Sequence, residues 1–330
     1  MARTHSPRHG SMQFWPRVRA RRAYARVRSW SSANAAPKDP VLGFIGYKAG
    51  MTHIMAIDAR KNSITKGEEI FVPVTVIECP PVKIAGVRLY RNAYGGKQAA
   101  KDLLFKLDKD LSRKLILPKK HHDLSELNDL NPADYSDVRI LAYSQPRLSG
   151  VAKKKPELFE LALSGTVEEK LKYIEENHDK ELHVNSIFKE AEFCDIHAVT
   201  RGKGFQGPVK RFGIALKPHK SEKGVRRVGT LGAWRGQGHT LYRVAHAGQM
   251  GYHTRTEYNK KILKISNKPE EVNPKGAFPH YGNLKSTFVL IRGSVAGAQK
   301  RAIIFTKQMR TQRTTEAAPT IIYISQESKQ

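Results

Sequence analysis

The chain has 330 residues, of which 58 are Lys or Arg and 30 are Asp or Glu, so its formal net charge is +28. Hydrophobic residues make up 39%, enough for a core, but no apolar stretch approaches the about 18 residues that a membrane-spanning helix needs. The two cysteines, Cys79 and Cys194, exclude a disulfide framework and a cysteine-rich zinc site, and they fit a reducing, cytosolic compartment. A charge of this size opposes compaction unless a polyanion neutralises it, and nucleic acid is the commonest such partner. An anionic membrane surface, a soluble thermophilic protein and a generally basic protein are the alternatives.

The positive charge is segregated along the chain. Residues 1–38 hold eight arginines and one lysine without any acid, and residues 200–268 hold 16 Lys or Arg against two acids. Residues 101–195, by contrast, hold 19 acids and 16 bases and are close to neutral. Random surface basicity does not produce this distribution, so we expect two cationic segments that bind RNA and a globular remainder.

The first cationic segment, residues 1–40, is poor in aliphatic residues and is interrupted by four prolines, so it cannot fold alone. Its arginines alternate with Phe14, Trp15 and Trp30, and both aromatic and guanidinium planes stack on bases. We therefore predict an arm that becomes ordered on RNA. An organellar transit peptide is the alternative, because that class is also rich in Arg and Ser and poor in acids.

Short strands are predicted before and after a central region that contains a helix. Residues 41–58 suggest a strand, a turn and a second strand, and residues 71–79 form a β-branched run closed by Pro80-Pro81. Further strands are expected at 192–200, 287–293, 301–306 and 321–325. Between them, Thr166 and Glu169 form a capping-box signature for a helix that continues to about His178. Leu171 and Ile174 then lie on one face of that helix.

Gly202-Lys203-Gly204-Phe205-Gln206-Gly207 matches the spacing of a dinucleotide-binding loop. Such a loop needs a helix that begins within it, and here Pro208 follows at once and residues 209–215 lack helical periodicity. We therefore expect an extended loop whose glycines allow the backbone to approach RNA closely.

Residues 229–255 contain three histidines at seven-residue spacing, His239, His246 and His253. The glycines between them disfavour a helix, so hydrogen bonding to or stacking on RNA is favoured over a metal site. Trp234, between two glycines in a basic loop, is expected at a tip that contacts nucleotides. The sequence contains no P-loop, no G-x-S-x-G and no H-E-x-x-H motif.

The predicted RNA-binding residues combine these arguments, and no catalytic residue, metal ligand or cofactor is predicted. They are Arg8, Phe14, Trp15, Arg17, Arg19, Arg21, Arg22, Arg201, Lys203, Lys210, Arg211, Lys220, Lys223, Arg226, Arg227, Trp234, Arg235, His239, Arg243, Gln249, His253 and Arg255.

Several blocks in a fixed order resemble one known family. They are Phe14-Trp15-Pro16-Arg17, Gly46-Tyr47-Lys48-Ala49-Gly50-Met51-Thr52, the block at 202–207, Gly232-Ala233-Trp234, Ala247-Gly248-Gln249-Met250-Gly251-Tyr252-His253, and Phe278-Pro279-His280-Tyr281-Gly282. The chain resembles, over nearly its whole length, the family of the universal third protein of the large ribosomal subunit in its archaeal–eukaryotic form. Its short C-terminus is similar to that of archaeal members. Many relatives have His-Pro after the Trp of the central loop, whereas this chain has Arg235-Gly236.

The resemblance implies a mainly β fold, namely a translation-protein-type β-barrel with an inserted α/β region and extended basic arms. The implied division is an N-terminal extension at 1–40, barrel segments at 41–85, 186–200 and 269–330, an inserted region at 86–185, and a central loop at 201–268. The resemblance also implies a structural, non-enzymatic role in the cytoplasmic large subunit, where both arms enter the 23S rRNA and Trp234 approaches the peptidyl transferase centre. The implied neighbours are the fourteenth universal large-subunit protein and a small archaeal zinc-binding protein, with no membrane contact. An RNA-modifying enzyme with a basic groove is the alternative function.

Overall fold

The computed structural model describes residues 14–30, 40–60, 62–229, 231–232, 244–310 and 319–329. Five predicted RNA-binding residues lie outside the described residues: Arg8, Trp234, Arg235, His239 and Arg243. The chain divides into two compact units. Unit 1 comprises Met1–Ala23 and Val199–Arg255, and unit 2 comprises Tyr24–Ala198 and Thr256–Gln330.

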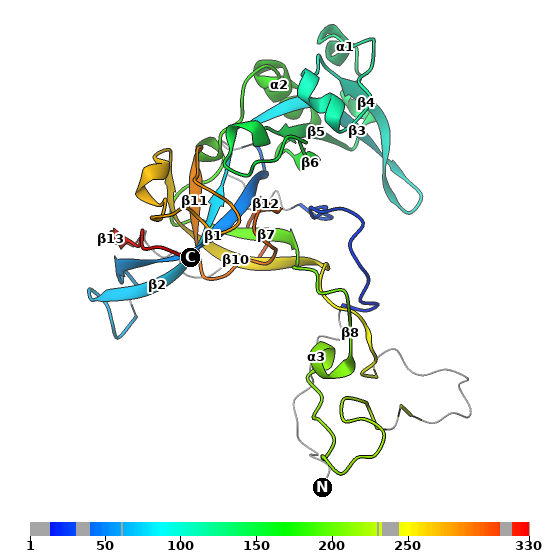
Figure 1. Ribbon diagram of the computed structural model, residues 1–330. Coiled ribbons are helices and arrows are strands. Elements are labelled where there is room, and N and C mark those ends of the chain that lie inside the picture. Colours follow the sequence, from blue (N-terminus) through cyan, green and yellow to red (C-terminus); the bar gives the residue numbers. More distant parts are fainter. Residues whose placement is uncertain are drawn as a thin grey trace. The chain divides into compact units, whose positions relative to one another are not determined.

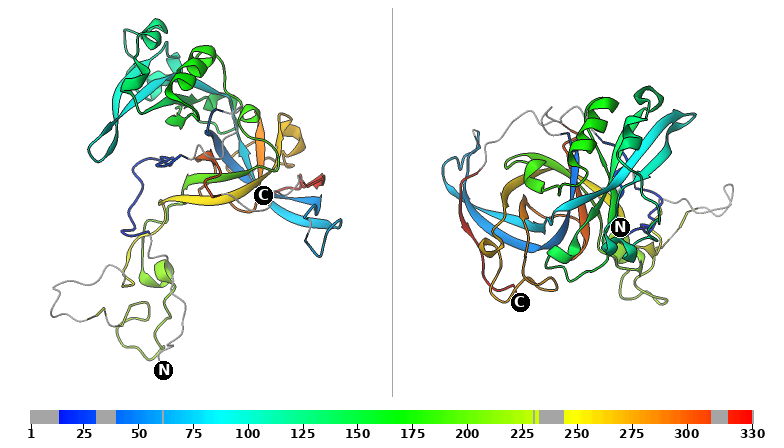
Figure 2. Two further views of the ribbon diagram at one scale, coloured as in Figure 1. Left: turned by 180° about the vertical axis from the view of Figure 1, so that it is seen from behind. Right: turned by 90° about the horizontal axis from the view of Figure 1, so that it is seen from above.

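Unit 2 is built around a large sheet whose strands close into a ring. The sheet order is β12-β7-β10-β11-β2-β1-β13, and β1 also pairs with β12, which closes the ring (Figures 1 and 2). The strands are β1 (Gly43–Ile57), β2 (Glu69–Glu78), β7 (Phe193–Val199), β10 (Thr254–Ser266), β11 (Phe288–Arg292), β12 (Ala302–Lys307) and β13 (Ile321–Ile324). The expectation of a mainly β fold is confirmed.

Most of the predicted strands lie where the β-branched runs indicated. Residues 71–79, 192–200, 287–293, 301–306 and 321–325 correspond within about two residues to β2, β7, β11, β12 and β13. Residues 201–268 were expected to be a loop. The end of this segment instead contains the 13-residue strand β10.

The prediction of two strands and a turn for residues 41–58 is wrong. These residues form the single 15-residue strand β1, and the only irregularity in its pairing with β2 is a register shift between Lys48 and Gly50. Its second half alternates strictly, with Thr52 and Ile54 buried between more exposed neighbours, as expected for a strand with one face on the core.

The glycines of β1 serve packing and not a turn. A Cβ at Gly46 would lie 2.7 Å from the Cys79 Sγ, and a Cβ at Gly50 would lie 2.6 Å from the Phe278 ring. Each glycine therefore leaves room for a buried side chain beside the strand, which is why glycine-rich sequence here does not end the strand.

A second, four-stranded sheet in unit 2 has the order β4-β3-β5-β6. Its strands are β3 (Val82–Ala93), β4 (Gly96–Leu104), β5 (Asp137–Ser144) and β6 (Leu158–Ala162). The helices of unit 2 are α1 (Ser125–Asn128) and α2 (Val167–Asn177), and 3-10 turns occupy Lys109–Arg113, Pro132–Asp134, Pro146–Leu148, Val184–Ser186 and Pro269–Glu271. No helix among the described residues is long and apolar enough to cross a membrane.

The helix predicted from the capping box is confirmed as α2. The Thr166 side chain accepts a hydrogen bond from the Glu169 backbone N–H (3.4 Å), and the Glu169 carboxylate accepts one from the Thr166 N–H (2.8 Å). Leu171 and Ile174 are buried on one face, as their spacing indicated.

Part of residues 24–30 packs into the core of unit 2 while Arg26, Arg28 and Ser29 stay exposed, which differs from the arm predicted for this part of the N-terminal segment. Tyr24 and Val27 are buried in the hydrophobic core, and the Tyr24 hydroxyl donates a hydrogen bond to the Leu158 carbonyl. The Trp30 ring packs against the same core and fills the space beside Gly43, so it is not available to stack on bases.

One buried carboxylate ties three segments of unit 2 together. The fully buried Glu78, at the end of β2, accepts hydrogen bonds from the backbone N–H groups of Gly150 (2.9 Å), Lys285 (2.7 Å) and Ser286 (2.9 Å). The hydroxyls of Tyr281 and Ser286 complete its set of partners. A buried charge is tolerated when it is surrounded by donors in this way.

Candidate nucleic-acid interface

Unit 1 is held together by an antiparallel ribbon that joins the two ends of its central segment. Strands β8 (Phe205–Gln206) and β9 (Gly248–Gln249) pair with each other. The ladder continues beyond them, because the Lys203 N–H donates to the Met250 carbonyl and the Met250 N–H donates to the Gly204 carbonyl, each at 2.9 Å. The Thr200 N–H donates to the His253 carbonyl at 2.9 Å and extends the ribbon further.

Gly251 is required by the close approach of the two strands of this ribbon. Its φ of +72° lies in the left-handed region, and a Cβ at this position would lie 2.0 Å from the Arg201 carbonyl oxygen. The need for glycine at position 251 therefore comes from the protein's own backbone.

The N-terminal residues of unit 1 lie along the same ribbon. The Ala20 N–H donates to the Tyr252 carbonyl at 2.7 Å, and the His253 Nδ1–H donates to the Val18 carbonyl at 2.9 Å. A carbonyl can only accept, so Nδ1 carries the proton. Burial lowers the pKa of His253 below its ordinary value, and the hydrogen bond to Val18 offsets only part of this effect. The imidazole is therefore neutral near pH 7 and connects two chain segments.

A short helix follows the glycine-rich loop, contrary to our expectation that none would begin there. Helix α3 (Pro208–Phe212) has Pro208 in its first turn, where the missing proline N–H costs nothing because that N–H has no partner within the helix. It ends at Gly213, which adopts the left-handed conformation (φ +65°). With five residues, α3 provides one turn and no dinucleotide-binding geometry.

Arg211, on α3, donates hydrogen bonds inside the protein. Its Nε–H donates to the Gln249 carbonyl at 3.1 Å, and its Nη1–H donates to the His246 carbonyl at 2.9 Å. Both partners lie on the returning strand of the ribbon, so Arg211 clamps α3 to β9.

An aromatic cluster fixes the N-terminal residues onto α3. The rings of Trp15 and Phe212 are stacked, with centroids 5.8 Å apart and an interplanar angle of 17°. The Arg17 guanidinium carbon lies 4.7 Å from the Trp15 ring centre and 4.3 Å from that of Phe212. Arg255 covers the neighbouring Phe14 ring at 4.2 Å. Cation–π contacts of this kind are worth about 0.5–1 kcal/mol each when exposed.

The predicted RNA-binding residues of unit 1 therefore divide into two groups. The first group makes contacts inside the protein: Phe14, Trp15, Arg17, Arg211, Gln249, His253 and Arg255. Of these, the Gln249 side chain donates hydrogen bonds to the Met250 and Gly251 carbonyls. The second group consists of exposed cations: Arg19, Arg21, Arg22, Arg201, Lys203, Lys210, Lys220, Lys223, Arg226 and Arg227. We call this second group the exposed cations of unit 1.

Charge in unit 1 is almost entirely of one sign. Its described residues, 14–23, 199–229, 231–232 and 244–255, contain fourteen Lys or Arg and a single acid, Glu222. A surface of this composition attracts polyanions and gives salt-dependent binding.

Two aromatic residues of this interface were missing from the sequence-based set. Phe212 is buried and forms the centre of the cluster, and nothing in its local sequence distinguishes it from an ordinary core residue. Phe205, by contrast, is 77% exposed and lies between Gly204 and Gly207, two residues after Lys203. An aromatic residue between glycines in a basic segment is a signal that could have identified it.

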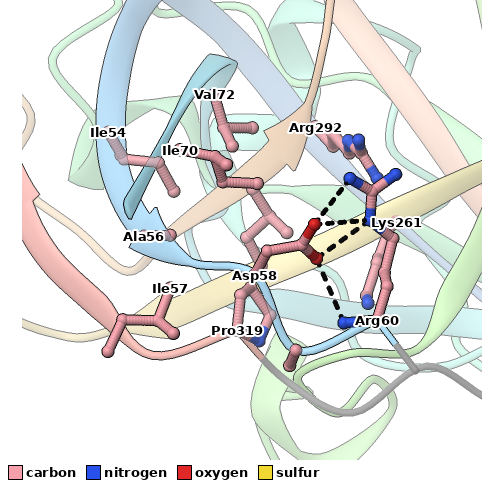
Figure 3. A pocket seen from close by; sticks show the side chains of 12 residues that line it. Ile54, Ala56, Ile57, Asp58, Arg60, Ile70, Val72, Lys261, Arg292 and Pro319 are labelled. Atoms are coloured by element: carbon pink, nitrogen blue, oxygen red, sulfur yellow. Dashed lines mark hydrogen bonds and ion pairs between the residues drawn. The ribbon is translucent and has the colours of Figure 1, made fainter. Parts of the chain in front are cut away.

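One cavity among the described residues can be compared with this interface. A cavity in unit 2 lies between β1, β2, β10 and β11, with an apolar wall that includes Ile54 and Val72 (Figure 3). Its acidic group, Asp58, accepts hydrogen bonds from the Arg60 guanidinium (2.8 and 2.9 Å) and from the Thr65 hydroxyl (2.8 Å). The Arg60 and Ser63 hydrogen bonds hold the pKa of Asp58 well below its usual range, so this carboxylate stays ionised and paired with Arg60. Among the described residues, no cluster of three or more His, Cys, Asp or Glu side chains could hold a metal ion.

Comparisons with known proteins place this chain in a family. A family model described as "Ribosomal protein L3" matches residues 1–330. "Large ribosomal subunit protein uL3" of Archaeoglobus fulgidus is 45% identical over 330 residues, which cover 99% of this chain and 98% of the relative. The proteins of the same name from Methanothermobacter thermautotrophicus and Methanosphaera stadtmanae are 46% and 42% identical, and each alignment covers 100% of this chain and 99% of the relative. All three are named as ribosomal proteins and not as enzymes.

Proposed function

The chain belongs to the ribosomal protein L3 family, and we propose that it is a structural constituent of the large ribosomal subunit that binds large-subunit (23S) rRNA through unit 1. One observation carries the proposal of RNA binding. Several exposed cations of unit 1, among them Arg19, Lys203 and Lys210, lie on backbone that the protein itself holds in place through the ribbon, Arg211 and the aromatic cluster.

The proposed mechanism is neutralisation of phosphates where rRNA segments approach one another. Each phosphate that is neutralised releases condensed counterions, which favours binding and adds about 0.7–0.9 to the slope of log affinity against log salt. Exposed arginines also present a planar fork that matches two phosphate oxygens. The positions of these cations in unit 1 would thus support the folding of the RNA around them.

Stacking contributes a second kind of contact. Phe205 has an exposed ring and follows Lys203 by two residues, so a base could stack on the ring while the lysine meets a nearby phosphate. Trp234 and the other predicted residues outside the described ranges belong to the same proposal on the basis of the family resemblance, including the approach of Trp234 to the peptidyl transferase centre. Contacts with the fourteenth universal protein and a small zinc-binding protein are proposed on the same basis.

The test is the salt dependence of binding to protein-free large-subunit rRNA. We expect the double variant Arg226→Glu/Arg227→Glu to lower affinity and to flatten the log–log slope by at least about 1.4–1.8, since two phosphate contacts are lost. The matched control is Lys154→Glu/Lys155→Glu, which reverses two exposed lysines of unit 2 and changes the net charge equally.

Equal slopes for the two double variants would contradict the assignment of RNA binding to unit 1. Membership in the particle is tested separately by co-sedimentation of the full chain with large subunits. A stoichiometric amount is expected of a structural constituent, whereas an RNA-modifying enzyme would be present in a much smaller amount.

A further inference from the structure

The hairpin formed by β3 and β4 extends away from the rest of its sheet. Figure 1 and the left view of Figure 2 show these strands continuing together past β5 and β6. Residues 91–102 are all exposed, although the two strands stay paired, with a register shift between Leu89 and Tyr90, up to Ala93 and Gly96. Tyr94, in the two-residue turn, has its side chain fully in solvent. Hydrophobic collapse therefore does not account for this aromatic residue.

The hairpin is braced at several points below its tip. Lys97 forms an ion pair with Asp137 (3.1 Å), whose other oxygen pairs with Lys170 (2.7 Å). On the neighbouring strand, the Arg91 guanidinium lies 5.1 Å from the Tyr135 ring centre. These contacts fix the direction of the hairpin, so Tyr94 is presented in a defined place and not on a loose loop.

The charge of the hairpin points to an anionic partner. Residues 91–101 contain Arg91, Lys97 and Lys101 and no acid, within a part of the chain that is otherwise close to neutral. Although Lys97 and Lys101 have carboxylate neighbours, their side chains remain 47% and 45% exposed, so both can also reach a ligand phosphate.

The tip leaves the tyrosine ring open to stacking. Gly95 and Gly96 both have positive φ, and a Cβ on either would meet nothing within 4 Å, so the surroundings of the ring are unobstructed. A protein partner would need a wider apolar area around the tyrosine, because hot spots are surrounded by contacts that exclude water. Here the neighbours are small residues such as Ala93 and Gly95 and polar residues such as Asn92 and Gln98, which do not form a wide apolar area.

We propose that the β3–β4 hairpin is a further RNA-binding site, in which Tyr94 stacks on an unpaired nucleotide and Lys97 contacts the adjacent phosphate backbone. The proposal rests on the proposed function, since it takes the RNA to be that of the large subunit. It assigns an RNA contact to unit 2, outside the two cationic segments.

The test measures binding of the full chain to protein-free large-subunit rRNA over a range of salt concentrations. Tyr94→Ala should weaken binding by about fivefold or more with an unchanged salt slope, because stacking is lost without loss of charge. Tyr94→Phe should bind like the wild type, and Lys97→Gln should reduce the slope by about 0.7–0.9. The control is Ile116→Ala, which removes another side chain of unit 2 that is almost fully exposed.

If Tyr94→Ala and Ile116→Ala both bind like the wild type, the proposal is wrong. A photoreactive residue provides a second measurement in assembled subunits, through Tyr94→p-benzoylphenylalanine. Attachment to rRNA supports the proposal, and attachment to a neighbouring protein overturns it. Failure of the wild-type chain to bind rRNA at all would refute the proposed function itself, so the two failures are distinguishable.

Discussion

Replacing Arg211 by Ala should loosen unit 1 without removing a phosphate contact. Its guanidinium donates to the Gln249 and His246 carbonyls and lies 5.1 Å from the Phe212 ring centre. Because these partners are half-exposed and water can replace the lost donor, we assign about 1 kcal/mol to each hydrogen bond. The contact with the ring adds about 0.5–1 kcal/mol. The free energy of opening the ribbon should therefore fall by about 2–3 kcal/mol.

Amide hydrogen exchange measures this opening directly. The Lys203 and Met250 amides form the ladder next to β8 and β9, so their exchange reports on separation of the two strands. A loss of about 2–3 kcal/mol corresponds to roughly 30- to 150-fold faster exchange. Amides of the strand ring in unit 2 should exchange as in the wild type.

Lys210→Ala is the matched control, because Lys210 is an exposed cation on the same helix. It should leave the exchange of both amides unchanged and reduce the salt slope of rRNA binding, whereas Arg211→Ala should show the opposite pattern. Unchanged exchange in Arg211→Ala together with a flatter salt slope would refute the reasoning and make Arg211 a phosphate ligand.

Three further substitutions test other parts of the structure. Gly251→Ala should destabilise the ribbon by more than about 1–2 kcal/mol, the cost of an alanine in the left-handed region, since its Cβ would also meet the Arg201 carbonyl oxygen. Gly207→Ala is the control and should be tolerated, because a Cβ there meets nothing within 4 Å. Hydrogen exchange of the Met250 amide compares the two variants. The pKa of His253 is lower in the folded state than its ordinary value of 6.5, so the ribbon should lose stability as the pH falls below 6.5. In His253→Asn, this part of the pH dependence of amide exchange should disappear. Glu78→Gln should lower the free energy of unfolding of unit 2 by about 2–4 kcal/mol in urea titrations, because an amide nitrogen cannot accept the hydrogen bond from the Gly150 N–H. The control Glu69→Gln, on the exposed end of β2, should have little effect. Equal urea midpoints for the two variants would count against a stabilising role for the Glu78 carboxylate.

Local signals in the sequence were sufficient for elements whose stability is local. The capping box of Thr166 and Glu169 predicted where α2 begins, because each partner lies three residues from the other. Strand β2 was equally visible, since its β-branched run and the following prolines mark its length and its end.

Elements defined by distant partners could not be predicted in this way. Strand β10 contains three lysines that disturb its alternating pattern, and it is identified by pairing with β11 and by its place beside β7. In β1 the glycines suggested a turn because the sequence does not show that Cys79 and Phe278 occupy the space beside them. Tertiary packing decided both cases.

The same limitation applies to the interface. Composition and charge distribution identified unit 1 as the basic part of the chain, and ten of the predicted residues are exposed cations. Composition cannot, however, distinguish a cation that faces solvent from one such as Arg211 that faces backbone carbonyls. That distinction depends on which strand returns beside α3.

The two groups of residues in unit 1 have connected roles in binding. Fixing a backbone residue costs about 1–2 kcal/mol, so a long basic segment that became ordered only on RNA would lose much of its electrostatic gain. Arg211, Phe212 and the His253–Val18 hydrogen bond order part of this backbone with contacts inside the protein. Weakening this group should therefore reduce rRNA affinity at every salt concentration by the same factor, whereas removal of exposed cations should change the salt slope. The contrast between these two effects separates preorganisation from phosphate contact in one set of titrations.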